Sequence, residues 1–227
     1  VYNAKDPVIL TAYGAKGAAY LGLDTKSDKN AVQSNLMTSA FAAVMMTRED
    51  EAFEPLLTMA TTGSPLEKGA ALAALSDIDD TGRAAQLLDI ALSDDTEMTG
   101  RQATSIVLGL LAHDKHRDMT WDWLKTNFDA YVTARVPDVR RSRMPAYAGV
   151  FCSKDKRDEV EAFITKNASV IPGYERSLAQ TLETIENQLD DPAKGWSILT
   201  KLENKYGKGI NNLTIVERAK DALRKAE

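Results

Sequence analysis

Apolar residues recur at helical spacing along most of the chain. Phe53, Leu56, Leu57 and Ala60 follow the i, i+3, i+4, i+7 pattern, and residues 103–110 repeat it. This spacing places apolar side chains on one face of an α-helix. Strict alternation of apolar and polar residues, which marks a half-buried strand, is rare over a strand's length. The pattern predicts an all-α protein.

Local signals indicate where the helices begin and end. Ser64, Pro65 and Glu67 form a capping box with proline at the first helical position, which satisfies backbone N–H groups that the first turn leaves unpaired. Pro55 lies inside one expected helix and should kink it or delay its start. We expect about twelve helices, over residues 7–22, 30–46, 48–60, 65–76, 81–92, 100–112, 118–134, 139–152, 154–167, 173–189, 194–206 and 213–226.

Successive helix pairs repeat every ~35 to 40 residues, and their short connections imply antiparallel neighbours. This predicts a HEAT/armadillo-like superhelical array of antiparallel helix pairs, in which each pair buries its apolar face against the next pair. No residue-level self-similarity accompanies the repeat, so the prediction rests on architecture. A compact, irregular helical bundle is the alternative.

Composition and charge exclude several classes of protein. The 227 residues are 44% apolar, enough for a sizeable core, and 28 basic against 33 acidic residues give a net charge of −5. Because nucleic-acid binding needs clustered positive charge, we expect no nucleic-acid partner. No run of about 20 apolar residues and no signal-peptide pattern occur, so we expect a soluble protein with no membrane partner. The compartment stays open, with the cytoplasm slightly favoured.

The two histidines of the chain stand close together. His113 and His116 are three residues apart, and Asp114 or Asp118 is near enough in sequence to add a third metal ligand. The basic residues around them would repel a cation, so we favour a solvated turn and predict no metal site. Glycine-rich phosphate loops, Gly-x-Ser-x-Gly and His-Glu-x-x-His are absent from the sequence, and we predict no catalytic residue.

Aromatic residues concentrate in the expected 118–134 helix, and the lone cysteine follows later. The aromatic segment contains Trp121, Trp123, Leu124, Phe128 and Tyr131. Leu124, Phe128 and Tyr131 share one helix face, so core packing is favoured over a ligand cage or a stacking platform for nucleic acid. Cys152 follows two apolar residues, which predicts a buried structural thiol.

Four arginines form the main local charge anomaly of this acidic chain. Arg135, Arg140, Arg141 and Arg143 lie close together, and no acidic residue follows the last three until Asp155. The last three stand near the start of the expected 139–152 helix, where the macrodipole disfavours positive charge by about 0.3–1 kcal/mol each. An anionic partner would offset that cost, so Arg140, Arg141 and Arg143 are candidate substrate-binding residues. A solvated helix start is the alternative.

Several strings follow one another in the order and spacing of a known domain. They are TREDEAFEPLL at residues 47–57, EKGAALAAL at 67–75, WDWLKTNF at 121–128, FCS at 151–153, VEAF at 160–163 and PGYERSLAQTLETI at 172–185. Their succession resembles the helical C-terminal domain of aminopeptidase-N-like (gluzincin) zinc aminopeptidases, over about residues 1–188. Residues 189–227 depart from this pattern, and we interpret them as an extra helical hairpin or an added tail.

The resemblance implies a non-catalytic part of a larger enzyme. In such enzymes an upstream catalytic domain binds zinc through a His-Glu-x-x-His helix and a later glutamate, and the zinc activates water for peptide hydrolysis. For this chain the resemblance implies a helical bowl that closes over the catalytic domain of the same polypeptide, walls off the chamber and offers basic side chains to peptide substrates. No cofactor is expected in the chain itself. The start at Val1, shortly before a helical pattern, agrees with an excised segment.

Two other functions are compatible with the sequence. A free-standing HEAT-like scaffold would bind a protein partner along its concave face. An unrecognised helical enzyme would need a carboxylate pair, such as Asp79 and Asp80, for acid–base chemistry. Adjacent acids beside Thr81 and Gly82 are more typical of a helix cap. We therefore expect the non-catalytic C-terminal domain of a zinc aminopeptidase.

Overall fold

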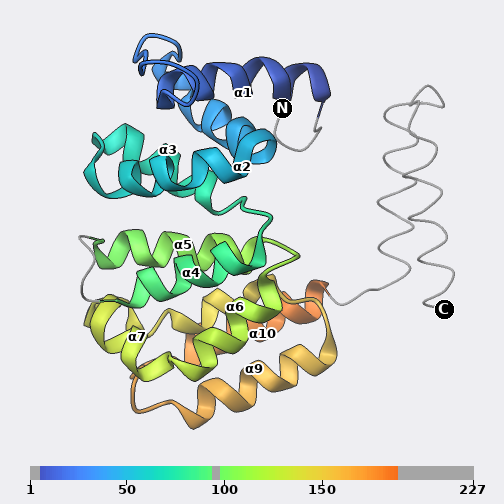
Figure 1. Cartoon of the computed structure of the whole chain (residues 1–227). Helices are drawn as coiled ribbons and strands as arrows, with labels where there is room; N and C mark the ends of the chain where they lie inside the picture. Colours follow the sequence, from blue (N-terminus) through green and yellow to red (C-terminus); the bar gives the residue numbers. More distant parts are fainter. Residues whose placement is uncertain (1–5, 94–97, 189–227) are drawn as a thin grey trace, which may run out of the picture.

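The computed structural model describes residues 6–93 and 98–188, and every regular element within these ranges is helical. In this part of the chain ten α-helices and two short 3-10 helices follow one another (Figure 1). Their bounds are α1 (Pro7–Leu21), η1 (Ser34–Leu36), α2 (Met37–Thr62), α3 (Pro65–Leu75), α4 (Thr81–Leu92), α5 (Gly100–Ala112), α6 (Arg117–Thr126), α7 (Phe128–Arg135), α8 (Asp138–Arg141), η2 (Met144–Val150), α9 (Lys154–Lys166) and α10 (Glu175–Gln188). The predicted all-α class is confirmed.

The helices are stacked in layers (Figure 1). α1 packs against α2, α2 against α3, and α3 against α5. α4 pairs with α5, α5 also contacts α6 and α7, and α10 packs against η2 and α9. One continuous cluster of buried apolar residues runs from Ala18 to Ile185. Each layer therefore buries an apolar face against the next one.

Side-chain caps begin several helices at the predicted positions. At α3, Ser64 Oγ accepts the backbone N–H of Glu67 at 3.4 Å, and Glu67 Oε2 accepts the backbone N–H of Ser64 at 2.8 Å. Asp80 caps α4, and Ser153 caps α9. Each cap satisfies a backbone donor that has no partner inside the helix. The predicted capping box and these helix starts are confirmed.

The capping glutamate of α3 also ties α1 to α3. Tyr20 Oη donates to Glu67 Oε1 at 2.8 Å, and Lys29 Nζ lies 3.0 Å from the same oxygen. Burial and then the hydrogen bond to Glu67 raise the pKa of Tyr20 to about 12. Hydrogen bonds from Ser64, Tyr20 and Lys29 lower the pKa of Glu67 to about 2. This carboxylate therefore stays ionised while it joins two layers.

The expected helices over residues 30–46 and 48–60 form one element, α2, with a kink between them. Arg48 has non-helical backbone angles, φ −145° and ψ 48°, inside α2. α2 begins only at Met37, because the residues before it form a loop and η1. Pro55 lies in the second half of α2, which continues past it to Thr62. The interruption therefore lies at Arg48. The kink or late start that we expected at Pro55 does not occur.

Two expected helices are wrong in their extent. The expected 118–134 helix is divided into α6 and α7 at Asn127, whose Nδ2 donates to the carbonyl of Trp123 at 2.9 Å. A short polar side chain competes here with the helical hydrogen bonds of the backbone. The expected 139–152 helix is the single turn α8 followed by η2. Pro145 explains the difference, because proline has no N–H for the interior of an α-helix.

Burial confirms the packing role of the aromatic segment and corrects the prediction for the cysteine. Trp121 and Phe128 are buried, and each makes an edge-on contact with the ring of Phe163. Cys152 is exposed, so the predicted buried thiol is wrong. Because η2 ends at Val150, the helical periodicity that suggested burial does not extend to Cys152.

No described helix is both long and apolar enough to cross a bilayer. The expected helices over residues 194–206 and 213–226 lie outside the described residues, as does the whole segment 189–227 that we interpreted as a hairpin or tail.

α1 and α2 approach each other closely because glycines stand at their crossing. A Cβ on Gly17 would lie 2.5 Å from the backbone oxygen of Ala40, and a Cβ on Gly14 would lie 2.8 Å from Thr47 Oγ1. Gly69, inside α3, has no atom within 4 Å of the position of a Cβ. The first crossing therefore needs glycine for space, whereas α3 does not.

We predict that Gly17→Ala destabilises the protein and that Gly69→Ala stabilises it. The backbone oxygen of Ala40 cannot rotate away, so the new methyl group must push α1 from α2, at a cost of about 1–3 kcal/mol. At Gly69 alanine only improves helix propensity, by about 0.5–1 kcal/mol. Urea unfolding followed by circular dichroism measures both changes. Changes of the same sign would contradict the close approach at Gly17.

Candidate functional site

The predicted substrate-binding arginines lie on α8 and just after it. Arg140 and Arg141 are in the last turn of α8, and Arg143 follows the helix. The dipole argument that singled them out is therefore wrong, because a helix C-terminus favours positive charge. Arg141 Nη2 lies 2.9 Å from Asp138 Oδ1, and its Nε donates to the carbonyl of Val136 at 3.3 Å. Arg141 thus has local partners within its own turn.

Arg140 and Arg143 are exposed, and neither makes an ion pair with any residue that the structure describes. Val139 beside them is 85% exposed. We call Val139, Arg140 and Arg143 the arginine corner. Positive charge beside an exposed apolar side chain is suited to an anionic partner, and the predicted contact with substrate stays a prediction.

Arg135, the fourth residue of the basic run, has a structural role. Its guanidinium donates to the carbonyls of Leu92 and Ser93, where α4 ends, and to the carbonyl of Met98 before α5. The last carbonyls of a helix have no partner within the helix, and a cation is favourable beside them. Arg135 therefore joins α7 to the end of α4.

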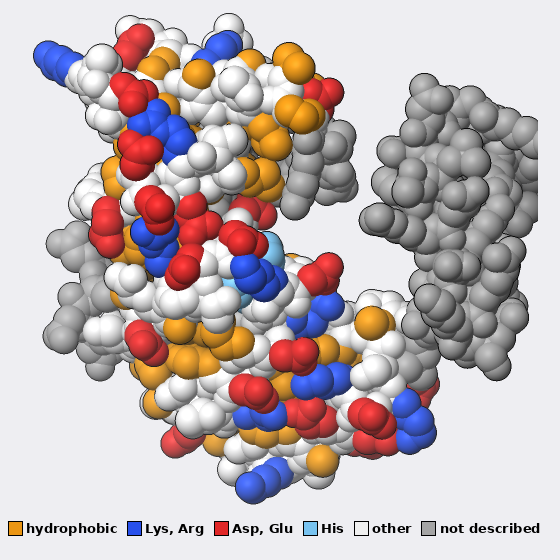
Figure 2. All heavy atoms as spheres, turned by 45° about the vertical axis from the view of Figure 1, so that its right-hand side comes forward, with side chains coloured by type: hydrophobic (Ala, Val, Ile, Leu, Met, Phe, Trp, Pro, Cys, Tyr) orange, Lys and Arg blue, Asp and Glu red, His pale blue; other side chains and the backbone are white. Residues whose placement is uncertain are grey.

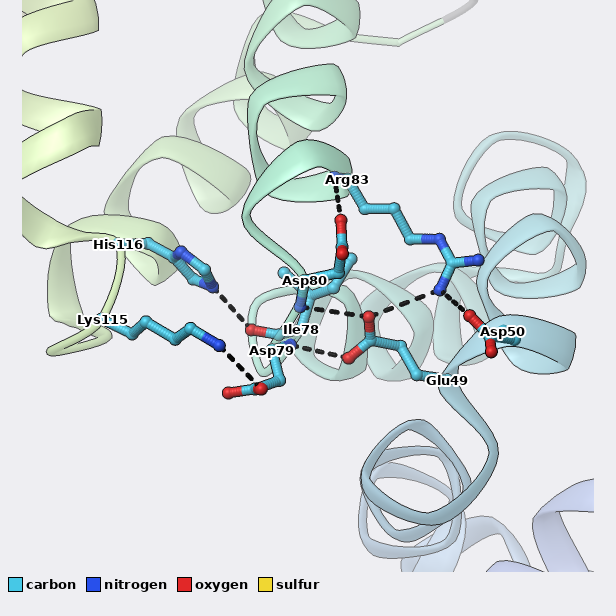
Figure 3. Close-up of polar contacts among 8 residues, drawn as sticks. All are labelled: Glu49, Asp50, Ile78, Asp79, Asp80, Arg83, Lys115 and His116. Carbon is cyan, nitrogen blue, oxygen red and sulfur yellow. Dashed lines mark hydrogen bonds and ion pairs between the residues drawn. The ribbon is translucent and has the colours of Figure 1, made fainter.

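A network of polar side chains joins three parts of the fold (Figure 3). Glu49 lies just after the kink in α2, and its carboxylate accepts the backbone N–H groups of Asp79 and Asp80 at 2.7 and 3.1 Å. Both N–H groups belong to the connection between α3 and α4, so Glu49 joins two layers. We call Glu49, Asp79, Asp80, Arg83, Lys115 and His116 the polar junction. Figure 2 shows acidic and basic side chains gathered over the middle of one face, with histidine beside them.

Arg83, in the first turn of α4, also contacts the carboxylate of Glu49 in α2. Its Nη1 lies 3.4 Å from Glu49 Oε1 and 2.7 Å from Asp50 Oδ1. The guanidinium carbon lies 5.4 Å from the centre of the Phe53 ring. Positive charge is unfavourable in the first turn of a helix, and the two carboxylates of α2 offset that effect.

The turn between α5 and α6 reaches the α3–α4 connection as well (Figure 3). His116 Nε2 donates to the carbonyl of Ile78 at 2.8 Å, and Lys115 Nζ lies 2.7 Å from Asp79 Oδ2. His116 is fully buried, and its ring stacks on that of His113 with 4.8 Å between the centroids. The predicted solvated turn is therefore wrong for His116. The hydrogen bond to the Ile78 carbonyl compensates for burial of Nε2, whereas Nδ1 is buried with no hydrogen-bond partner among the described residues.

The polar junction is arranged for cohesion and not for acid–base catalysis. The hydrogen bond from Lys115 lowers the pKa of Asp79, so this carboxylate is a poor general base near neutral pH. Asp80 caps α4 through a hydrogen bond from the backbone N–H of Arg83 at 2.8 Å, as its sequence context predicted. Within residues 6–93 and 98–188, no group of three or more His, Cys, Asp or Glu side chains is placed to hold a metal ion.

The carboxyl group of Asp77, next to the polar junction, is partly buried, and one of its oxygens lacks a hydrogen bond that would offset the burial. Asp77 Oδ2 is buried and has no hydrogen-bond partner among residues 6–93 and 98–188. Burial raises the pKa of Asp77 to about 6, because the low-dielectric surroundings disfavour the charged form. At neutral pH the ionised Asp77 therefore opposes the packing of the α3–α4 connection.

A groove of about 680 Å³ runs between α3 and α5. Lys68 of α3 and Arg101 of α5 line it, and Leu72 contributes an apolar side chain. Neither cation makes an ion pair with another described residue. The volume is in the range of grooves that hold small ligands or short peptide segments.

Nothing in the sequence singles out Glu49 or Arg83 as the residues that join the layers. Glu49 belongs to a run of three acidic residues, of which Asp50 and Glu51 are exposed. The only usable signal is the predicted boundary between residues 46 and 48, because a chain that bends there turns the following side chains toward a new neighbour. The sequence does not indicate which neighbour that is.

One family resembles the chain over most of its length, and two curated proteins resemble shorter parts of it. A family model described as ERAP1-like C-terminal domain matches residues 3–187. Aminopeptidase M1-C of Oryza sativa subsp. japonica is 30% identical over 124 residues, which are 52% of this chain and 13% of that protein. Aminopeptidase 2, mitochondrial, of Saccharomyces cerevisiae is 30% identical over 82 residues, which are 35% of this chain and 8% of that protein. The chain thus spans only a small part of the length of these curated relatives.

We predict that Glu49→Ala lowers the free energy of unfolding by about 1–3 kcal/mol, because it leaves the N–H groups of Asp79 and Asp80 without an acceptor between two layers. Glu54→Ala, on the exposed side of α2, is the matched control and should change stability by less than about 0.5 kcal/mol. Urea unfolding measures both. If the two variants lose equal stability, water replaces the carboxylate at no cost and Glu49 does not hold the layers.

We predict that Asp77→Asn stabilises the protein at pH 7.5 and has little effect at pH 4. The folded pKa of about 6 lies above the ordinary value of 3.8, so the folded state binds the proton more readily. The favourable contribution of protonated Asp77 to the free energy of unfolding is complete below the ordinary pKa of 3.8, and it is lost as the pH rises through the folded pKa of about 6. Asparagine does not ionise, so at pH 7.5 it should raise the free energy of unfolding by about 1–2 kcal/mol. This is less than the full pKa shift of Asp77 implies, because the group is only partly buried. Equal gains at both pH values would contradict this cause.

Proposed function

The chain belongs to the family of ERAP1-like C-terminal domains, and from this we propose that it is the non-catalytic C-terminal domain of a zinc metallo-aminopeptidase. The observation that carries the proposal is the match over residues 3–187, which include nearly all of the described residues. The named relatives are aminopeptidases, and the matched segments are small parts of them. In this proposal the peptide bond is cleaved by another domain of the same polypeptide.

The zinc ion belongs to that other domain in our proposal, because the described residues of this chain do not fit a zinc site. His116 is fully buried, and its Nε2 is engaged with the carbonyl of Ile78. A catalytic zinc needs three protein ligands that converge on one position, and the described ranges contain no such group.

The domain covers the catalytic domain and shapes the peptide chamber. The layered helices, in which α1 to α3 and then α4 and α5 bury their faces against their neighbours, support a HEAT/armadillo-like superhelical array. An array of this kind offers a long wall built from rigid helices. Such a wall binds substrate and excludes competing molecules, and it leaves bond cleavage to the catalytic domain.

The arginine corner is the part of this wall that we assign to peptide substrates. Arg140 and Arg143 are exposed and have no ion pair among the described residues, so their charges are available to a peptide carboxylate. Arg141, the third candidate, shares its charge with Asp138. A hydrogen bond from an arginine to a carboxylate in a partly enclosed chamber contributes roughly 1.5–3 kcal/mol.

A free-standing scaffold that binds a protein partner is the second candidate function. The groove between α3 and α5 favours it, because Lys68 and Arg101 line a space large enough for a peptide segment. The coding sequence upstream of this domain distinguishes the two functions, since a scaffold would have no zinc-peptidase sequence there.

We predict that Arg140→Ala and Arg143→Ala, in the full-length polypeptide, raise the Michaelis constant for peptides by about tenfold, which corresponds to about 1.4 kcal/mol. Kinetics with a small aminoacyl anilide should not change, because this substrate is too short to reach the wall. Arg141→Ala is the matched control and should have a smaller effect, since Arg141 is already paired. Steady-state kinetics with both substrates measures the difference.

The chain alone should hydrolyse neither substrate, with or without added zinc. Turnover that follows the purified chain and disappears with a chelator would contradict the assignment of catalysis to another domain. Unchanged peptide kinetics in all three arginine variants would show that the arginine corner is a solvated surface.

A further inference from the structure

The groove between α3 and α5 lies between two points where neighbouring helices meet. At one of them, Gln102 Nε2 in the first turn of α5 donates to the carbonyl of Ala60 at 2.6 Å, shortly before α3 begins. At the other, the last turn of α5 lies so close to the end of α3 that a Cβ on Gly109 would overlap Ser76 Oγ. α3 and α5 therefore run in the same direction, and these contacts fix the distance between the two walls of the groove.

Small residues line the middle of the groove. Gly69 and Ala73 of α3 and Ser105 of α5 are exposed there, and no atom lies within 4 Å of the position of a Cβ on Gly69. The α3 wall extends from Pro65 to Ser76, which at the rise of an α-helix spans roughly 16 Å. An extended chain of about five residues has this length. The groove therefore has the shape for a short extended segment and space for its side chains.

The two walls of the groove carry positive charge and no negative charge. Lys68 stands on the α3 wall and Arg101 on the α5 wall, and none of the described residues that line the groove is Asp or Glu, although the chain has 33 of these. Arg101 lies in the first turn of α5, where positive charge is unfavourable. In the first turn of α4, the charge of Arg83 is offset by Glu49 and Asp50. Arg101 has no such carboxylate among the described residues, so an anionic ligand would offset its charge.

The polar groups of the groove indicate which anion suits it. The hydroxyl groups of Ser76 and Ser105 donate to backbone carbonyls of their own helices, at 3.0 and 3.1 Å. No aromatic side chain is among the described residues that line the groove, so a nucleotide base would find no ring to stack on. Charge-assisted hydrogen bonds from Lys68 and Arg101 are therefore the main polar contacts that the groove offers, and carboxylates accept them.

We propose that this groove binds a short, extended, acidic segment of a partner protein. One acidic side chain faces Lys68 and another faces Arg101, and an apolar side chain between them contacts Leu72, which also lines the groove. Two cations on opposite walls need two carboxylates, whereas the end of a peptide chain offers only one. The occupant is therefore an internal segment. The inference goes beyond the proposed function and holds for a peptidase domain and for a scaffold alike.

Fluorescence anisotropy with a labelled peptide tests the groove in the purified chain. The probe is Glu-Glu-Leu-Glu-Glu with an uncharged label on its N-terminus and an amide at its C-terminus, so that it has no terminal carboxylate. Its matched control is Gln-Gln-Leu-Gln-Gln with the same blocked ends. The acidic peptide should bind at least about tenfold more tightly than the neutral one, and Lys68→Gln and Arg101→Gln should each weaken its binding by about tenfold.

A steric variant and a charge control separate the groove from the overall charge of the protein. Gly69→Leu places a side chain in the groove and leaves the charge unchanged. Because the space around Gly69 is open, the fold should tolerate this change, and binding of the acidic peptide should fall at least about tenfold. Lys16→Gln removes a positive charge from the exposed side of α1, away from the groove, and should leave the affinity unchanged. Urea unfolding of each variant checks that the fold is retained.

Several results would overturn the proposal. No binding of the acidic peptide, equal affinity for both peptides, or equal losses in Lys16→Gln and Arg101→Gln would mean that the groove does not select carboxylates. Unchanged binding in a folded Gly69→Leu variant would place the peptide elsewhere, and if this variant unfolds, the two charge variants decide. A full-length polypeptide that no longer binds the peptide would also overturn the proposal, since a segment of the same polypeptide would then fill the groove. None of these results depends on peptidase activity, which tests the proposed function separately.

Discussion

The fold depends on polar side chains that satisfy backbone groups where one helix layer meets the next. Glu49 accepts two N–H groups of the α3–α4 connection, and His116 donates to the Ile78 carbonyl in the same connection. Arg135 does the same for the carbonyls at the end of α4. Backbone groups in such half-buried places must find a partner, because each unpaired one costs about 1–3 kcal/mol. The polar and charged residues where the layers meet therefore have a structural role, which is to satisfy backbone N–H and carbonyl groups.

Features that depend on neighbouring residues in the chain could be predicted from the sequence. The apolar face over residues 103–110 is fully buried, and the capping box at Ser64 and Glu67 forms as expected. Features that depend on a single competing residue were missed. Asn127 divides one expected helix with its side-chain amide, and Pro145 turns another into a 3-10 helix. Helical periodicity continues through both residues, so it carries no sign of the interruption.

The candidate site shows where a sequence stops being informative. Arg140 and Arg141 are adjacent and chemically identical, yet Arg141 binds Asp138 and a backbone carbonyl while Arg140 has no ion pair among the described residues. Likewise, His116 is buried against Ile78, 38 positions earlier in the chain. Only the packing of distant segments decides such partners. The sequence therefore shows where the charged residues are, and the tertiary structure shows which partner each of them has.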